Sequence, residues 1–251
     1  MSANLWPKEV ARHVLETVDS TNALALRRAP SLVGPAWFLG LEQTAGKGRR
    51  ARAWASPRGN FHASLLLHPV EPAEQVALRS FAAALALRDA LIAVTGLSVG
   101  WSLKWPNDVL LNGGKLAGIL LESIGVGQGG AHLAIGFGVN LISAPPLDQI
   151  EAEALLPVSL LGETGVRIAP EVFLDALAPA YAAWETEFTA NGFSTLRSAW
   201  LADAARLGET IRARSGTQTR SGVFETIDQS GNLVLRTSQG SVVIPAAEVF
   251  F

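Results

Sequence analysis

Hydrophobic and polar positions follow two different patterns along the chain, and the change between them lies near residue 204. Before this point, apolar strand-like runs are mixed with Ala/Leu-rich stretches typical of helices. After it, short alternating segments are separated by turn residues, as at residues 228–232 (DQSGN). We therefore predict two domains, an α+β domain over residues 1–203 and a small all-β barrel or sandwich over residues 204–251.

The larger part carries strand and helix signals without the strict alternation of a parallel fold. Strands are expected at residues 37–42, 61–67 and 132–141, and a hairpin around the turn sequence NGG at 112–114. Helices are expected at 23–28, 74–94, 170–187 and 194–201, the first of them after the polar cap DSTN at 19–22. The pattern indicates a mixed β-sheet flanked by helices, with residues 145–165 too irregular to assign.

Composition narrows the classes of function. The chain has 251 residues, 49% of them hydrophobic and 17% charged, so a sizeable core can form. The formal net charge is −2, whereas proteins that bind nucleic acid through phosphate contacts are usually more basic. Cysteine is absent, which excludes disulfides, thiolate metal sites and a cysteine-linked acyl intermediate.

No targeting or metal-binding pattern is visible in the sequence. The charged N-terminus lacks the apolar run of a signal peptide, and the longest apolar stretch, 80–94, is too short to cross a bilayer. His13, His62, His68 and His132 are not spaced as metal ligands, so each is expected to be packed or on the surface. We expect a soluble cytoplasmic protein with no membrane segment and no metal held by the protein itself.

A basic loop at residues 46–54 (GKGRRARAW) is the first candidate for chemistry. Gly46 and Gly48 let backbone N–H groups approach an anion, and four cationic side chains lie close by. The run suits a phosphate or carboxylate ligand, although a solvated basic turn or a nucleic-acid patch has the same composition. A phosphate-binding P-loop is excluded because its glycine-lysine spacing does not occur.

Three further segments carry candidate residues. In residues 104–108 (KWPND), Lys104 on an apolar strand requires an anionic partner, unless it is a surface lysine beside a buried tryptophan. In residues 115–122 (KLAGILLE), Gly118 indicates either close approach of a ligand or another backbone, or a β-bulge. In residues 136–140 (GFGVN), a strand-end turn is the default interpretation of the glycines, and admission of a ligand is the alternative.

Taken in this order, these segments resemble the motifs of the bacterial biotin protein ligases. KWPND is the family's sequence unchanged, and KLAGILLE matches its Lys-Leu-x-Gly-Ile-Leu-x-Glu. The loop matches Gly-Arg-Gly-Arg-Arg-Gly-Arg-x-Trp, residues 20–22 match Ser-Thr-Asn, and residues 136–140 match Gly-x-Gly-x-Asn. The resemblance covers nearly the whole chain, since the β-rich tail is similar to the family's SH3-like C-terminal domain.

The resemblance implies a biotin/lipoate-ligase-type catalytic domain over 1–203 and an SH3-like β-barrel over 204–251. It implies an ATP- and Mg²⁺-dependent ligase that forms biotinyl-5′-AMP and transfers biotin to a lysine ε-amine of a biotin carboxyl carrier protein. Some relatives carry an N-terminal DNA-binding domain, but here the first motif begins too early to leave room for one. We therefore expect a monofunctional enzyme without specific DNA binding, and a homodimer through an exposed sheet edge stays open.

Site residues follow from the same resemblance. Contacts with biotin are implied for Ser20, Thr21, Asn22, Gln43, Lys47, Gly48, Arg49, Lys104 and Gly118. Contacts with the nucleotide are implied for Arg50, Arg52, Trp54, Asn107, Lys115 and Asn140. Lys104 and Arg49 are expected to be catalytic, because biotin's carboxylate and ATP are both anions whose charges must be neutralised as they meet.

Three positions depart from the family pattern. Lys47 stands where arginine is usual, which keeps the charge but loses the planar fork. Ala51 replaces a usual glycine, and Ala247-Glu248 stands where Gly-Glu is common, which leaves the tail's part in the site open.

The rival functions are a lipoate or octanoate ligase or transferase, whose cysteine-dependent forms the composition excludes, and a noncatalytic biotin- or nucleotide-binding regulator.

Overall fold

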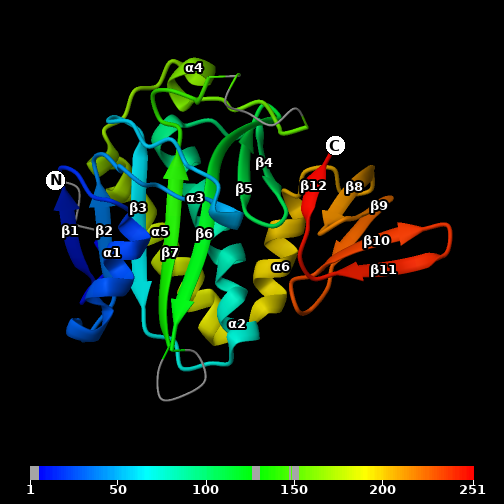
Figure 1. Ribbon diagram of the computed structural model, residues 1–251, viewed down its shortest axis with the longest axis horizontal. Coiled ribbons are helices and arrows are strands. Elements are labelled where there is room, and N and C mark those ends of the chain that lie inside the picture. The colour runs from blue at the N-terminus through cyan, green and yellow to red at the C-terminus, as the bar shows by residue number, and fades with distance from the viewer. Residues whose placement is uncertain (1–5, 126–130, 147, 149–152) are drawn as a thin grey trace.

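The computed structural model describes residues 6–125, 131–146, 148 and 153–251, and contains two β-sheets (Figure 1). The larger sheet has the strand order β1-β2-β3-β7-β6-β5-β4, with β1 parallel to β2 and the other pairs antiparallel. Its strands are β1 (Ala11–Leu15), β2 (Ala36–Gly40), β3 (Phe61–Leu67), β4 (Trp101–Lys104), β5 (Asp108–Leu111), β6 (Gly114–Ile124) and β7 (His132–Val139). This mixed sheet confirms the predicted α+β class.

Helices cover both faces of the larger sheet. They are α1 (Thr21–Arg28), η1 (Ala29–Ser31), η2 (Arg49–Ala51), α2 (Ala73–Ala77), α3 (Arg79–Thr95), α4 (Leu160–Thr164), α5 (Pro170–Asn191) and α6 (Phe193–Ala202). Helix α1 lies on one face, and α3 and α5 pack together on the other (Figure 1). Within the described part of the chain, no helix has the length and hydropathy needed to cross a bilayer.

Strand β3, in the middle of the sheet, shows how the sequence divides between the two faces. Successive strand residues point to opposite sides. Phe61 and Leu65 belong to the main core under α3 and α5, whereas Leu66 packs with the smaller cluster beneath α1. On that same side Ser64 is fully buried and hydrogen-bonds to the start of α1. On β3, the α1 face of the sheet therefore combines apolar packing with a buried polar group.

The predicted helix at 74–94 is two helices, and the prediction of one continuous helix was wrong. Leu78 separates α2 from α3, and its N–H bonds to the carbonyl of Gln75, three residues back, which tightens the chain into a turn. Ten residues of α3 are buried, as its Ala/Leu-rich sequence indicated. The helix ends at Gly96, whose positive φ of 70° closes the last turn.

The second sheet has the order β11-β10-β9-β8-β12, and it is antiparallel throughout. Its strands are β8 (Thr210–Ser215), β9 (Gln218–Ile227), β10 (Leu233–Thr237), β11 (Gly240–Ile244) and β12 (Glu248–Phe250). The predicted barrel is not closed, because β11 and β12 are the two outer strands of the order and do not pair with each other. The predicted boundary at residues 203/204 stays a prediction.

The second sheet is held against the KWPND segment. The Trp105 indole N–H donates to the carbonyl of Gly231, in the turn between β9 and β10, over 3.0 Å. The N–H of Leu103 bonds to the carbonyl of Asp203 at 2.8 Å, where the chain leaves α6. These contacts place the C-terminal strand β12 beside β4 and β5, as Figure 1 shows. Packing between the two sheets therefore decides what stands next to Lys104.

Candidate active site

A cavity of about 790 Å³ opens on the α1 face of the larger sheet, a size that suits a small organic ligand. All the residues assigned to biotin or nucleotide in the sequence line it: Ser20, Thr21, Asn22, Gln43, Lys47, Gly48, Arg49, Arg50, Arg52, Trp54, Lys104, Asn107, Lys115, Gly118 and Asn140. Among the described lining residues, six are cationic and two, Asp108 and Glu248, are carboxylates. The cavity is therefore suited to an anionic ligand.

The basic loop folds back on itself above the sheet. The N–H of Trp54 bonds to the Gly46 carbonyl at 3.0 Å, and the N–H of Gly48 bonds to the Arg52 carbonyl at 2.8 Å. Between them, Arg50 and Ala51 have φ values of 56° and 58°, in the left-handed region that glycine adopts without cost. Ala51 therefore adopts a conformation that favours glycine, at a cost of about 1 kcal/mol.

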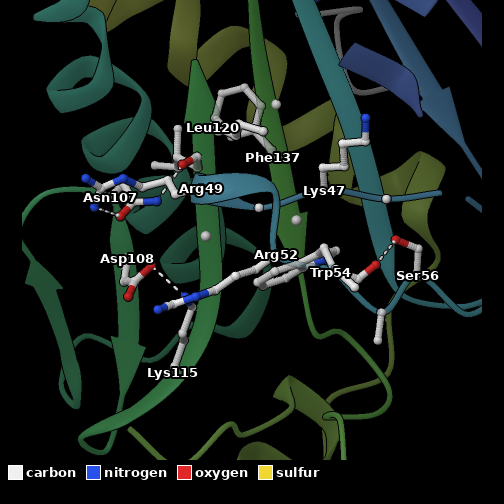
Figure 2. Close-up of a pocket in the computed structure, with 18 of the residues that line it drawn as sticks. Lys47, Arg49, Arg52, Trp54, Ser56, Asn107, Asp108, Lys115, Leu120 and Phe137 are labelled. Carbon is white, nitrogen blue, oxygen red and sulfur yellow. Dashed lines mark hydrogen bonds and ion pairs between the residues drawn. The ribbon is translucent and has the colours of Figure 1, made fainter. Parts of the chain in front are cut away.

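Two of the glycines singled out in the sequence lie beneath the Trp54 ring. A Cβ at Gly118 would lie 3.3 Å from that ring, and a Cβ at Gly138 would lie 2.5 Å from it. The register shift between β5 and β6 falls at Val109/Leu110, so Gly118 itself is not the bulge. Close approach explains Gly118, and its partner is the side chain of Trp54, which Figure 2 shows lying over the sheet.

Gly138→Ala should destabilise the protein by about 1–3 kcal/mol, because the new methyl group overlaps the indole. The free energy of unfolding in urea measures this, and trypsin cleavage after the loop arginines should become faster as Trp54 leaves the sheet. Gly34→Ala is the matched control, since its methyl group would meet only the Glu9 carbonyl at an ordinary 3.6 Å. Equal stability of the two variants would contradict the tight fit at Gly138.

Lys104, Asp108 and Lys115 form a charged group on the floor of the cavity. Lys104 and Asp108 are directly opposite on β4 and β5, and Asp108 is likewise opposite Gly118 on β6. An Asp108 oxygen lies 2.8 Å from Lys115 Nζ (Figure 2), and the other lies 3.9 Å from Lys104 Nζ. Burial lowers the pKa of Lys104. The positive charges of Lys115 and Arg49 lower this pKa further, whereas the negative charge of Asp108 raises it. The anionic partner expected for Lys104 is thus Asp108, although at a distance that leaves the ammonium open to a ligand.

Arg49 is the loop cation that reaches deepest. Its guanidinium donates to Asn107 Oδ1 and to the Ala247 carbonyl, both at 3.4 Å, while Asn107 Nδ2 donates to the Ile119 carbonyl at 2.7 Å. Burial lowers the pKa of Arg49, with Asp108 acting in the opposite direction. Lys47, by contrast, is exposed, and its ammonium points away from Asp108 (Figure 2). Arg49, from the loop, therefore lies near the charged group on the cavity floor to which Lys104 belongs.

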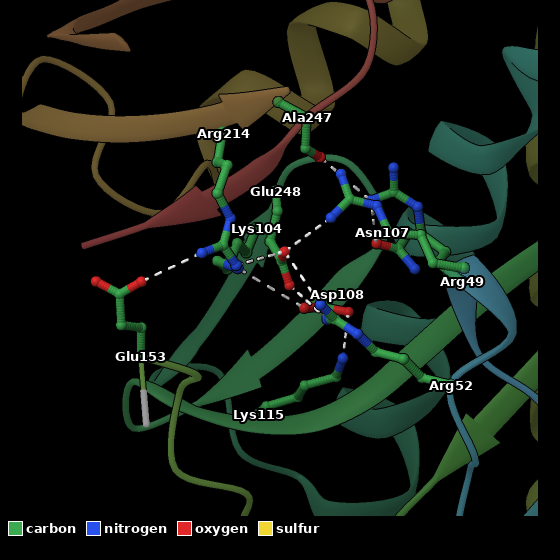
Figure 3. A network of polar contacts seen from close by, with 11 residues as sticks. Arg49, Arg52, Lys104, Asn107, Asp108, Lys115, Glu153, Arg214, Ala247 and Glu248 are labelled. Carbon is green, nitrogen blue, oxygen red and sulfur yellow. Dashed lines mark hydrogen bonds and ion pairs between the residues drawn. The ribbon is translucent and has the colours of Figure 1, made fainter. Parts of the chain in front are cut away.

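Glu248, on β12, binds three arginines at the edge of the cavity. It accepts hydrogen bonds from Arg50 at 2.9 Å, and from Arg52 at 2.5 Å and Arg214 at 3.1 Å, the latter two labelled in Figure 3. These bonds, with Arg52 the largest cause, lower the pKa of Glu248 to about 2. The sequence left open whether the tail contributes to the site. The structure shows a direct contribution, because Glu248 on β12 binds two of the arginines assigned to the nucleotide.

A neutral polar group occupies the other end of the cavity, at the start of α1. Ser20 caps the helix by accepting from the N–H of Ala23 at 3.4 Å, as its position in the DSTN motif predicted. Gln43 Oε1 accepts from the N–H of Thr21 at 2.8 Å, and Gln43 Nε2 donates to Ser56 Oγ at 2.9 Å. This end can exchange hydrogen bonds with an uncharged polar ligand group.

The glycines of the GFGVN segment lie inside β7 and line the cavity, so they are not the strand-end turn expected by default. A Cβ at Gly136 would lie 2.5 Å from Asn22 Oδ1, so this glycine, like Gly138, admits a side chain of the protein. Asn140 is 3% exposed, and its amide donates to the Val158 carbonyl at 3.1 Å. The glycines therefore let Asn22 and Trp54 lie flat on β7.

The histidines lie outside the charged end of the cavity. His62 is buried, and burial lowers its pKa to about 4. His68 and His132 contact each other through their Nδ1 atoms at 2.8 Å at one end of β3 and β7. Across the described ranges, no group of three or more metal-binding side chains is close enough to hold an ion.

Sequence reasoning missed four residues that the structure brings to the site: Ser56, Ser64, Asp108 as the partner of two lysines, and Glu248 as the partner of three arginines. Asp108 could have been found, because a buried lysine next to a carboxylate in one motif is a candidate ion pair. Ser56 and Ser64 carry no sequence signal. Glu248 is separated from Arg52 by 196 residues, so no local pattern joins them.

Comparisons with known proteins agree with this geometry. Residues 14–140 match the Biotin/lipoate A/B protein ligase family, and residues 207–251 match the Biotin protein ligase C terminal domain. The chain is 56% identical to a biotin--[acetyl-CoA-carboxylase] ligase of Paracoccus denitrificans over 95% of this chain and 99% of that protein. It is 34% identical to a Mycobacterium tuberculosis protein of the same name, over 94% and 87% of the two chains.

A solved structure has the same fold. The biotin protein ligase from Aquifex aeolicus in complex with biotin and ATP superimposes with a TM-score of 0.80, covering 95% of this chain and 97% of that one. The two sequences are 23% identical, so this likeness bears on the fold alone. It extends over both sheets of the present structure, since nearly all of each chain is covered.

Proposed function

The chain belongs to the biotin/lipoate A/B protein ligase family, and we propose that it activates biotin with ATP and transfers it to a lysine of an acceptor protein. One observation carries the proposal: a single cavity has a neutral polar end at α1 and a cationic end around Lys104, Arg49 and Lys115. Biotin has the same division, with a neutral ureido head and an anionic carboxylate, and ATP adds further negative charge.

In the first step, a biotin carboxylate oxygen forms a bond to the α-phosphorus of ATP, and the bond to the bridging oxygen breaks to release pyrophosphate. Both reactants are anions, so the site must neutralise their charge before they meet. Lys104 and Arg49, at the cationic end of the cavity, hold the reacting carboxylate and α-phosphate. Arg50, Arg52 and Lys115 bind the departing phosphates.

In the second step, the acceptor's lysine ε-amine attacks the acyl carbon of biotinyl-5′-AMP, the carbon–oxygen bond to AMP breaks, and an amide forms. No enzyme nucleophile is needed, in agreement with the absence of cysteine. Closure of the 46–54 loop over the cavity protects the adenylate from water. We propose a biotin carboxyl carrier subunit as the acceptor, in line with the name of the Paracoccus relative, and the cytoplasm as the location.

We propose that Mg²⁺ acts in the first step, bound to ATP. The described part of the chain has no cluster that would hold the ion alone, and the oxygens of Asp108 face Lys115 and Lys104. Mg²⁺ prefers phosphate oxygens and water, and it is commonly bound with few protein carboxylates. The residues present therefore fit an ion that enters with the triphosphate and neutralises part of its charge.

Purified protein supplied with ATP, Mg²⁺ and biotin should release pyrophosphate, and should do so only when biotin is present. Lipoate in place of biotin separates this function from the lipoate ligases of the same family. A lysine-containing carrier domain added afterwards should gain the mass of biotin by mass spectrometry. Absence of biotin-dependent release would contradict the proposal.

A further inference from the structure

Behind the neutral end of the cavity, two residues outside its lining contact Asn22. Glu122, on β6, accepts a hydrogen bond from Asn22 Nδ2 at 2.8 Å. Ser64, on β3, lies 2.5 Å from Asn22 Oδ1 through its hydroxyl. The Leu120 carbonyl also accepts from Asn22 Nδ2, at 3.2 Å. Asn22 is 4% exposed, so these three contacts decide its orientation.

The chemistry of the partners fixes which end of the Asn22 amide faces which way. The Leu120 carbonyl and the ionised Glu122 carboxylate can only accept hydrogen bonds. Rotating the amide by half a turn would place its oxygen against two acceptors, so the nitrogen must face β6. Both amide hydrogens are then used, one on each partner. Asn22 retains one oxygen lone pair, and no hydrogen, for a ligand.

The directions of the next hydrogen bonds follow from this orientation. Asn22 Oδ1 cannot donate, so the single Ser64 hydroxyl hydrogen points to it. The Thr21 hydroxyl hydrogen then points to Ser64 Oγ across their 2.7 Å contact, in preference to Gln43 Oε1 at 3.1 Å. The backbone N–H of Thr21 meets Gln43 Oε1, which turns Gln43 Nε2 toward Ser56.

This series of hydrogen bonds ends at the basic loop 46–54. Ser56 Oγ donates to the Trp54 carbonyl at 3.0 Å, at the end of the basic loop. One run of hydrogen bonds thus extends from the Glu122 carboxylate on the sheet to Trp54, with a single consistent set of directions. Glu122 is its only charged member among the described residues and fixes the directions as far as the Thr21 hydroxyl, whereas the backbone N–H of Thr21 fixes the orientation of Gln43.

We propose that Glu122 and Ser64 are positioning residues for ligand recognition, which they achieve by holding Asn22 as a pure acceptor toward the cavity. The proposal rests on the proposed function, in which this end of the cavity takes the ureido group of biotin. A ureido group has two N–H donors, and Asn22 Oδ1 is held to accept one of them. Gln43 keeps one amide hydrogen that can be donated to the ureido oxygen.

Glu122→Met tests the proposal, because methionine fills similar space without an acceptor. The KM for biotin should rise about tenfold, the strength of one hydrogen bond to a charged group, while the KM for ATP stays unchanged. Glu122→Gln keeps an acceptor oxygen and should restore the biotin KM to within about threefold of the wild type. A rise in the KM for ATP, or an unchanged KM for biotin, would overturn the proposal.

The matched control is Glu163→Met. Glu163, on α4, also accepts from an asparagine amide, that of Asn112 at 2.8 Å, and neither residue lines the cavity. This variant loses the same kind of hydrogen bond and should leave both KM values unchanged. If both methionine variants changed the biotin KM alike, the effect would be one of general stability and the proposal would fail.

Further measurements keep the proposal testable if Glu122→Met folds poorly, and separate its failure from failure of the proposed function. Ser64→Ala removes the other Asn22 contact and should also raise the biotin KM alone. Combining Asn22→Ala with Glu122→Met should add nothing to Asn22→Ala, because Glu122 acts through Asn22. Additive losses would show that Glu122 acts elsewhere. Wild-type protein that neither binds biotin by calorimetry nor releases pyrophosphate with it would instead refute the proposed function itself.

Discussion

Lys104→Ala should lower kcat/KM for biotin-dependent pyrophosphate release by at least about a thousandfold. The Lys104 side chain is only 11% exposed, and burial lowers its pKa because it disfavours the charged ammonium. A buried ammonium 3.9 Å from its carboxylate is poorly compensated in the protein alone. We expect the incoming carboxylate and α-phosphate to complete its partners, so that most of its stabilisation arises as charge builds up in the transition state.

The fold should survive this substitution, because Asp108 keeps Lys115 at 2.8 Å as its main partner. Thermal unfolding of Lys104→Ala and wild type should therefore agree closely, and Lys104→Arg should recover part of the rate by keeping the charge. The measurement is pyrophosphate release at saturating ATP over a range of biotin concentrations. A Lys104→Ala variant with near wild-type kcat would remove Lys104 from the chemistry.

Glu248→Lys should have the second largest effect, a loss of about a hundredfold in kcat/KM for ATP. The Glu248 carboxylate lies between Arg50, Arg52 and Arg214, and a lysine there would repel all three (Figure 3). Two of these arginines belong to the loop over the cavity, so the loop should leave β12 and the nucleotide should lose its contacts. Pyrophosphate release at saturating biotin, over a range of ATP concentrations, measures the loss.

Glu153→Lys is the control for this charge reversal. Glu153 pairs with Arg212 at 3.1 Å and with Arg214 at 3.5 Å, on the side of Arg214 away from the loop. It reverses the same charge next to a shared arginine without touching Arg50 or Arg52. We expect less than a threefold change, since exposed ion pairs contribute about 0–1 kcal/mol. Equal losses in the two variants would point to the net charge of the surface and against a specific contact.

The same contact predicts a dependence on pH. The Arg52 hydrogen bond lowers the pKa of Glu248 from its ordinary 4.5 to about 2, so folding favours the ionised carboxylate. Its contribution to stability is complete above pH 4.5 and is lost as the pH falls toward 2. The difference in unfolding free energy between wild type and Glu248→Gln should therefore shrink over this interval.

Most of the site residues could be predicted from the sequence because their motifs are short and local. KWPND places Lys104 and Asp108 at the facing ends of two adjacent strands, and KLAGILLE puts Lys115 and Gly118 on the next strand. A turn between neighbouring strands suffices to bring these residues together. The helix cap at Ser20 and the β3 strand at 61–67 follow equally local rules, and both predictions are confirmed.

Which side chains contact these residues depended on interactions between segments far apart in the sequence. The glycines of GFGVN indicated a strand-end turn or space for a ligand, and only the path of the 46–54 loop decides that Trp54 lies on Gly138. Likewise, Leu78 interrupts a sequence with no helix-breaking residue, and the barrel expected of the tail is an open sheet. Local propensity allows both outcomes, and tertiary packing selects between them.

By itself, the sequence determined the composition of the site: which cations it holds, which strands carry them, and that no cysteine takes part. Only the tertiary structure decided the partners of those cations. Glu248 meets Arg52 across 196 residues because the second sheet docks beside β4 and β5, and Glu122 meets Asn22 across 100 residues because α1 lies over β6 and β7. Charge and hydrogen-bonding capacity belong to single residues, whereas the direction in which they act is a property of the packed fold.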